Sequence, residues 1–117
     1  MKRAVVFYRT SSGCPFENFL DSLPGYAVQK ITWVLSVIEE LDNTVELFFK
    51  KADCADGIME CHVRCEDAVF RILSFFHGRD MIVVWGGILV KFQNMLTEQL
   101  KRVQRYRHDF LVLKAGT

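Results

Sequence analysis

The sequence lacks any apolar run long enough to cross a membrane. Its longest, MIVVWGGILV, covers residues 81–90, whereas a membrane-spanning helix needs about 20 apolar residues. The apolar run near the N-terminus, AVVFY, is also shorter than the roughly 7 or more residues of an export signal. We therefore expect a cytoplasmic protein with no membrane partner.

The pattern of the cysteines does not favour a metal site. The four cysteines are Cys14, Cys54, Cys61 and Cys65, which in the cytoplasm are expected to be reduced thiols. Along an extended strand Cys61 and Cys65 would lie about 13 Å apart, and His62 would point to the opposite face. We expect no metal and no cofactor.

The chain also lacks repeats, low-complexity segments and linkers, and its net charge is only +1. Because its 117 residues are half apolar, they suffice for one core, and we expect a single domain over residues 1–117. The charge is unevenly spread: residues 91–117 sum to +4 and the first ninety to −3. Such a basic segment can bind phosphate or can simply be a solvated helix face.

Hydrophobic periodicity predicts an α+β fold in which the helices cover one face of a mostly antiparallel sheet. Residues 3–9 have the β-branched and aromatic content of a strand, and two helices then form a hairpin, the second carrying an apolar stripe from Val28 to Leu41. Three antiparallel strands and a final amphipathic helix follow. The strands are IMECHVR, AVFRILSFF and MIVVWGG, and the helix runs from about Met95 to Val112.

The turns between the three strands suggest their register. With Glu66–Asp67 and Gly78–Arg79 as two-residue turns, His62 lies opposite Arg71, and Arg71 lies opposite Gly86. One sheet face is then almost wholly apolar and should receive the helices. It holds Met59, Cys61, Val63, Phe70, Ile72, Ser74, Val83 and Trp85.

The other face, expected to be open, carries the charged residues Glu60, His62, Arg64 and Arg71. Arg71 is diagonal to Glu60, within reach of long side chains. A guanidinium, an imidazole and a carboxylate on one surface suit phosphodiester chemistry, in which His62 moves a proton and Arg71 stabilises the phosphate. The alternative is a structural cross-strand ion pair between Glu60 and Arg71, worth about 0.2–1 kcal/mol.

Nearly the whole chain resembles the phage-derived, HigB-like branch of the RelE/ParE toxin superfamily. The resemblance rests on VVFYRTSSGCPFENFLDSLP, QKITWVLSVIEEL, FFKKADCADGIMECHVRCEDAVFRILSFF and RVQRYRHDFL. The strand pair DGIMECHVR and FRILSFF is its most specific part. It implies the helical hairpin on a curved sheet, and a toxin of a type II toxin–antitoxin pair.

HigB-like and RelE-like members cleave mRNA on the ribosome by a metal-independent transesterification that uses the 2′-hydroxyl of the RNA. The resemblance implies that Arg71 matches the family's strand arginine, that Lys50 and Lys51 match its basic pair, and that Glu60 matches an acidic position. The role of His62 rests on the register alone. The candidate catalytic residues are Arg71, His62, Lys50, Lys51 and Glu60, and the candidate RNA-binding residues are Arg64, Lys91, Lys101, Arg102 and Arg105.

The segment WGGILVKFQNML departs from the family. Gly86 stands where relatives carry a histidine, Leu89 and Val90 stand where lysines are expected, and Met95 and Leu96 replace Thr-Pro. These changes remove cations and an acid/base group beside Arg71, so the active site is expected to be weakened.

Three functions therefore remain open. The first is an mRNA endoribonuclease whose partners are mRNA, the ribosome and a helix-turn-helix antitoxin. The second is a non-catalytic protein of the same fold that binds an antitoxin or a second copy of itself through the apolar residues after Gly87. The third is a ParE-like inhibitor of gyrase, because a fold alone does not determine activity.

Overall fold

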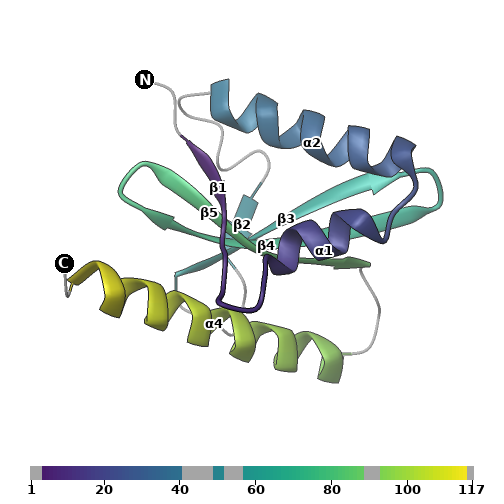
Figure 1. Cartoon of the computed structure of the whole chain (residues 1–117). Coiled ribbons are helices and arrows are strands. Elements are labelled where there is room, and N and C mark those ends of the chain that lie inside the picture. Colours follow the sequence, from purple (N-terminus) through teal and green to yellow (C-terminus); the bar gives the residue numbers. More distant parts are fainter. Residues whose placement is uncertain (1–3, 41–48, 52–56, 89–92, 116–117) are drawn as a thin grey trace.

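The computed structural model describes residues 4–40, 49–51, 57–88 and 93–115, which form an α+β fold (Figure 1). Two helices precede most of a mixed β-sheet, and a long helix follows it. In chain order the elements are β1 (Val5–Phe7), α1 (Pro15–Asp21), α2 (Gly25–Glu40), β2 (Phe49–Lys51), β3 (Ile58–Cys65), β4 (Ala68–His77), β5 (Asp80–Ile88) and α4 (Gln93–Ala115).

Among the described residues the sheet has five strands in the order β1-β5-β4-β3-β2. The antiparallel β3, β4 and β5 are the three strands that the sequence pattern predicts. The strand expected over residues 3–9 is shorter in the structure, where β1 covers Val5–Phe7. It lies parallel to β5. The short β2 was not predicted, and it pairs with β3 at the other edge. At three residues, β2 is too short to show an alternation in the sequence.

Both predicted hairpin turns are confirmed. Cys65 pairs with Ala68 and His77 with Asp80. Glu66 has φ 55° and Gly78 has φ 62°, the left-handed backbone that tight two-residue turns require. The predicted pairing of His62 with Arg71 follows from the first turn and is also confirmed.

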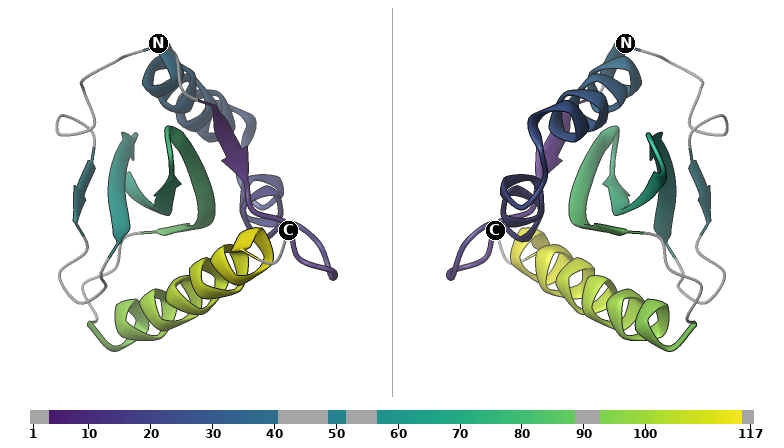
Figure 2. Two further views of the ribbon diagram at one scale, coloured as in Figure 1. Left: turned by 90° about the vertical axis from the view of Figure 1, so that its left-hand side faces the viewer. Right: turned by 90° about the vertical axis from the view of Figure 1, so that its right-hand side faces the viewer.

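The helices cover both faces of the sheet, so the expectation of one covered and one open face was wrong. Helices α1 and α2 pack on the face that was expected to receive the helices, which we call the first face. Helix α4 packs on the opposite face, which we call the second face (Figure 2). The reason is that the second face carries a group of large apolar side chains, and α4 supplies Leu100 and Val103 to cover them. The sheet residues beneath α4 are Ile58, Leu73, Phe75, Ile82 and Val84.

An irregularity in β5 changes which residues face Arg71. Leu73 pairs with Trp85 but Ser74 pairs with Val83, so that Val84 is an extra residue in β5. Trp85 therefore packs with the second-face core rather than the first. Gly87, not Gly86, lies opposite Arg71. The predicted register of β4 and β5 was one residue out here, because it was based on strict alternation along β5 and a bulge interrupts that alternation.

Gly86 allows α1 to approach the sheet. A Cβ atom at this position would lie 2.4 Å from Cδ2 of Phe19 and 3.0 Å from Cε1 of Phe16. We expect Gly86→Ala to lower the free energy of unfolding by about 1–3 kcal/mol, because the added methyl group overpacks this contact. Urea unfolding measures the change. Gly25→Ala is the matched control, since a Cβ at Gly25 meets nothing within 4 Å, and equal effects of the two substitutions would contradict the prediction.

Candidate functional site

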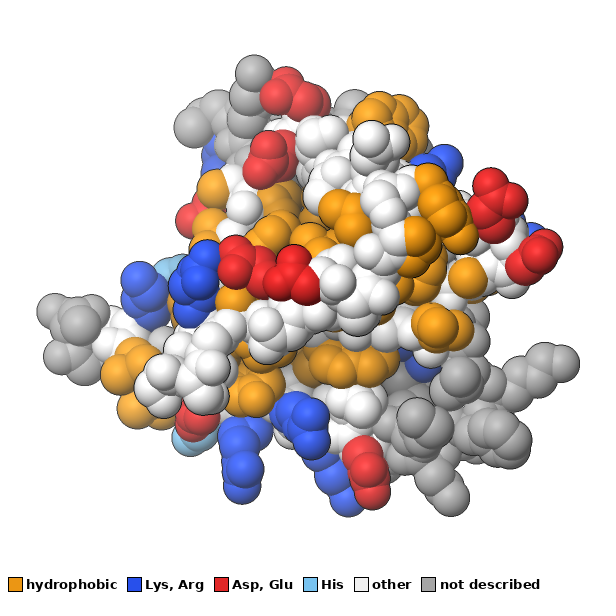
Figure 3. Space-filling model, turned by 45° about the vertical axis from the view of Figure 1, so that its right-hand side comes forward, with side chains coloured by type: hydrophobic (Ala, Val, Ile, Leu, Met, Phe, Trp, Pro, Cys, Tyr) orange, Lys and Arg blue, Asp and Glu red, His pale blue; other side chains and the backbone are white. Residues whose placement is uncertain are grey.

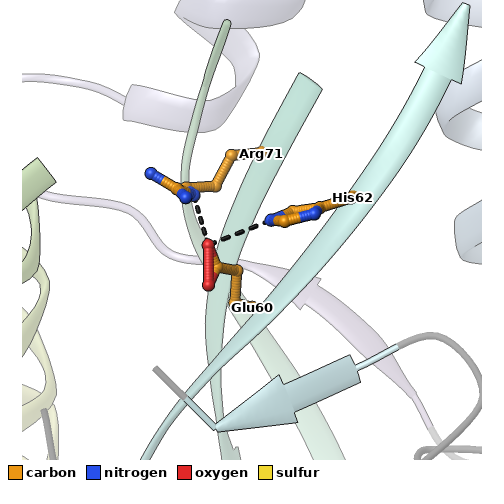
Figure 4. A network of polar contacts seen from close by, with 3 residues as sticks. All are labelled: Glu60, His62 and Arg71. Atoms are coloured by element: carbon orange, nitrogen blue, oxygen red, sulfur yellow. Dashed lines mark hydrogen bonds and ion pairs between the residues drawn. The ribbon is translucent and has the colours of Figure 1, made fainter. Parts of the chain in front are cut away.

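Glu60, His62 and Arg71 form a polar cluster on the second face of the sheet (Figure 4). Nε2 of His62 lies 3.0 Å from Oε1 of Glu60 and donates a hydrogen bond to it. Nε of Arg71 forms an ion pair with the same carboxylate oxygen. One oxygen therefore holds both the imidazole and the guanidinium.

The cluster is assembled by strand geometry. Glu60 and His62 are two residues apart on β3 and so share a face, while Arg71 is the register partner of His62 on β4. The predicted diagonal contact between Glu60 and Arg71 is confirmed. Residues on two successive strands thus meet because of the tight turn after Cys65.

Burial distinguishes the three side chains. The exposed fraction is 8% for Glu60, 12% for Arg71 and 32% for His62. The expectation that Arg71 lies on an open face was therefore wrong, and its contact with Glu60 is a buried ion pair rather than a surface pair. Breaking such a pair leaves an uncompensated buried charge, which is costly. His62 is the member of the cluster that solvent reaches most easily.

Trp85 lies beside the cluster, and sequence reasoning missed it. A Cβ atom on Gly87 would lie 2.4 Å from Cη2 and 2.6 Å from Cζ2 of Trp85, so the indole ring lies against the Gly87 backbone. Gly87 is the register partner of Arg71. The absence of a side chain at Gly87 therefore places a partly buried aromatic ring next to the cluster. The adjacent glycines of WGG were the available signal.

Of the candidate lysines, Lys50 and Lys51 lie in the described strand β2, whereas Lys91 does not lie in the described part of the chain. Lys50 in β2 is the register partner of Glu60, and Lys51 that of Met59. The backbone of Lys50 is therefore adjacent to that of the central carboxylate, although the sequence placed this pair before the sheet rather than within it. Arg64 is exposed near the end of β3.

Lys101, Arg102 and Arg105 gather on the exposed side of α4. They line a surface cavity of about 310 Å³, and all three are exposed. The helix is longer than predicted, Gln93–Ala115 rather than 95–112. These three cations are brought together as predicted, on an element separate from the strands that carry Glu60.

No described cysteine contributes to the cluster. Cys14, Cys61 and Cys65 are free thiols, and Cys61 belongs to the first-face core, on the side of β3 opposite to Glu60 and His62. Within the described ranges no three His, Cys, Asp or Glu side chains are placed to hold a metal ion. The described part of the cluster therefore contains no thiol that could act as a nucleophile.

Burial raises the pKa of the Cys61 thiol to about 12. The folded protein thus keeps a proton that the unfolded chain releases above pH 9, and stability must fall as pH rises through this window. We expect this thiol to lower the free energy of unfolding between pH 9 and 10.5 with a slope that rises to about 1.4 kcal/mol per pH unit as the unfolded thiol becomes fully ionised. Urea unfolding of wild type and Cys61→Ala across this range isolates the effect, and parallel pH profiles would contradict it.

Comparisons of the chain with models of known protein families, with curated proteins and with solved structures found no match. No helix in the described part of the chain is both long and apolar enough to cross a membrane.

Proposed function

We propose that this protein is a toxin of the RelE/HigB type that binds mRNA on the ribosome and cleaves it at the Glu60–His62–Arg71 cluster. The observation that supports the proposal most strongly is the single carboxylate oxygen that holds both an imidazole and a guanidinium. The resemblance of the strand pair to the family's strands gives the cluster its suggested role. The proposal includes a helix-turn-helix antitoxin as the partner that holds the toxin inactive.

The chemistry suits the three side chains. In the proposed reaction the 2′-hydroxyl of a ribose attacks the adjacent phosphorus, the P–O5′ bond breaks, and a 2′,3′-cyclic phosphate forms while the leaving O5′ takes a proton from water and departs as a 5′-hydroxyl. Because Glu60 accepts the Nε2 proton of His62, the other ring nitrogen is left to take the proton from the 2′-hydroxyl. The guanidinium of Arg71, whose outer end points away from Glu60 in Figure 4, stabilises the charge that builds on the phosphate.

A second function has a specific observation in its favour. Arg71 is largely buried and held by Glu60, and Gly87 supplies no side chain opposite it. Next to Gly87, Ile88 exposes 58% of its surface at the end of β5. The second function is that of a non-catalytic binding protein, which would bind an antitoxin or a second copy of itself at this exposed apolar end of β5 without cleaving RNA.

Induced expression in bacteria, followed by mapping of mRNA 5′ ends, separates these functions. The proposal predicts growth arrest and new ends within translated codons. Growth arrest with altered DNA supercoiling and intact mRNA would select the gyrase-inhibitor alternative. Intact mRNA together with normal growth would contradict the proposed activity and favour the non-catalytic binding protein.

The basic residues of α4 are expected to contact phosphates. Replacing Lys101, Arg102 and Arg105 by glutamine should weaken RNA binding and reduce the slope of log affinity against log salt by roughly one unit for each phosphate that is no longer bound. Binding of labelled single-stranded RNA at several salt concentrations measures this slope. Lys30→Gln, on the opposite side of the sheet in α2, is the control. An unchanged slope in the triple variant would assign these residues to a solvated surface.

A further inference from the structure

A second cavity, of about 560 Å³, lies between the end of β1 and the C-terminal half of α4. We call it the α4 groove. Its lining includes Tyr8, Arg9 and Thr10 from the β1 side and Tyr106, His108 and Asp109 from α4. It combines aromatic rings, hydrogen-bonding groups and charges, and none of these residues belongs to the Glu60 cluster.

The groove continues the basic surface of α4. Lys101, Arg105, His108 and Val112 follow one another at intervals of four, three and four residues, so they form one row along the helix. All four are exposed. Figure 3 shows Lys and Arg side chains along the lower edge of the molecule, where α4 lies, with hydrophobic side chains toward its left-hand end. A chain of phosphates bound at Lys101 and Arg105 would therefore lead into the groove.

The aromatic rings of the groove pack against the core beneath α4. The ring centroids of Tyr8 and Tyr106 are 5.2 Å apart, and the ring of Phe110 lies 6.4 Å from that of Tyr8. Burial, together with the nearby Asp109, raises the pKa of Tyr8, so its hydroxyl stays a proton donor. Ordered aromatic rings beside cations are the combination with which proteins bind unpaired bases.

The charges of the groove can orient a nucleotide. Arg9 is 66% exposed, and its Nη2 lies 2.6 Å from Oε1 of Glu17, which is also exposed. An exposed pair of this kind is weak, so a phosphate can compete with Glu17 for the guanidinium. Asp109 repels phosphate but can accept a hydrogen bond from the exocyclic amine of a base. The phosphate thus belongs near Arg9 and His108, and the base belongs near the tyrosines.

We propose that the α4 groove binds one nucleotide of single-stranded RNA, with its base against Tyr8 and Tyr106 and its phosphate at Arg9 and His108. This inference rests on the proposed function, because the RNA is the substrate that reaches the Glu60 cluster. The two cations Lys101 and Arg105, in one row with His108 along α4, favour RNA over a protein partner. The carboxylate of Asp109 favours cytosine or adenine, whose amines donate, over uracil.

The test uses the full chain and labelled single-stranded oligo(C), oligo(A) and oligo(U). We expect Arg9→Gln combined with His108→Gln to weaken oligo(C) binding at least tenfold, and Lys30→Gln to leave it unchanged. Asp109→Asn should remove the preference for oligo(C) and oligo(A) over oligo(U). Ultraviolet cross-linking of oligo(C) should label the peptide that contains Tyr106.

The outcomes separate this inference from the function on which it rests. RNA binding that is unchanged in the Arg9/His108 variant, while the Lys101/Arg102/Arg105 variant loses it, would overturn the groove and leave the proposed function standing. Wild type that binds none of the oligonucleotides would overturn both. A wild-type mass that rises with concentration and falls in Val112→Glu, with RNA binding unaffected, would make the groove a contact between copies and overturn the inference.

Discussion

Replacing Glu60 by leucine is expected to lower the free energy of unfolding by about 3–5 kcal/mol. The carboxylate is buried and holds Arg71 in an ion pair and His62 in a hydrogen bond. Its removal leaves a guanidinium that cannot lose its charge in a site that is 12% exposed. Urea unfolding monitored by circular dichroism measures the loss.

Two matched variants identify the cause of this loss. Glu17→Leu removes the acid of an exposed ion pair with Arg9 and should cost no more than about 1 kcal/mol. The double variant Glu60→Leu/Arg71→Met removes both buried charges and should restore most of the stability that Glu60→Leu removes. If the double variant is less stable than Glu60→Leu, the uncompensated charge is not the cause.

Replacing His62 by alanine is expected to reduce RNA cleavage by about 10²–10⁴-fold, the usual contribution of a general acid or base. The fold should be retained, because His62 is the most exposed member of the cluster and its ring lies at the edge of the buried pair. Single-turnover cleavage of mRNA on purified translating ribosomes measures the effect. His77→Ala is the control, since this histidine lies at the end of β4 beside Phe110.

Cleavage that survives in His62→Ala would remove the imidazole from the mechanism and leave Arg71 as the remaining candidate. Loss of cleavage in both histidine variants, with lowered unfolding midpoints, would mean that the assay reports stability rather than chemistry. Measuring both quantities on each variant distinguishes these results.

The sequence predicted the pairing of His62 with Arg71 correctly because a two-residue turn fixes the register of everything that follows it. Glu66 and Asp67 lie at the tip of the hairpin, and the alternation along β3 then brings Glu60 to the same face as His62. The contact between Glu60 and Arg71 needed only these two local facts. The most specific part of the candidate site was therefore available from the sequence.

The residue of β5 that pairs with Arg71 could not be predicted from the sequence, because the bulge at Val84 leaves no signal in the run MIVVWGG. Every residue from Met81 to Trp85 is apolar, so the period-two pattern that reveals a register is missing. The shift exchanges the roles of the two glycines: Gly86 faces Phe19 and Gly87 faces Trp85. A histidine introduced at Gly86 would therefore meet α1 rather than Arg71.

The covering of the second face by α4 was missed for a different reason. The pattern assigned Leu73, Phe75, Ile82 and Val84 to that face, but the charged residues beside them suggested an open surface. These aliphatic and aromatic side chains are nonetheless buried beneath α4. The charged cluster lies on the same face as this apolar core, and burial there is what makes its ion pair costly to break.

The measurement that tests the central claim most directly is mRNA cleavage on translating ribosomes by wild type and by Glu60→Leu/Arg71→Met, with both proteins shown to be folded. The double variant removes the carboxylate and the guanidinium together, so no uncompensated charge is left in the buried site. If the cluster is the catalytic site, wild type cuts mRNA within codons and the folded double variant leaves it intact. Equal cleavage by the two proteins, or none by wild type, would contradict the assignment of endoribonuclease activity to Glu60, His62 and Arg71.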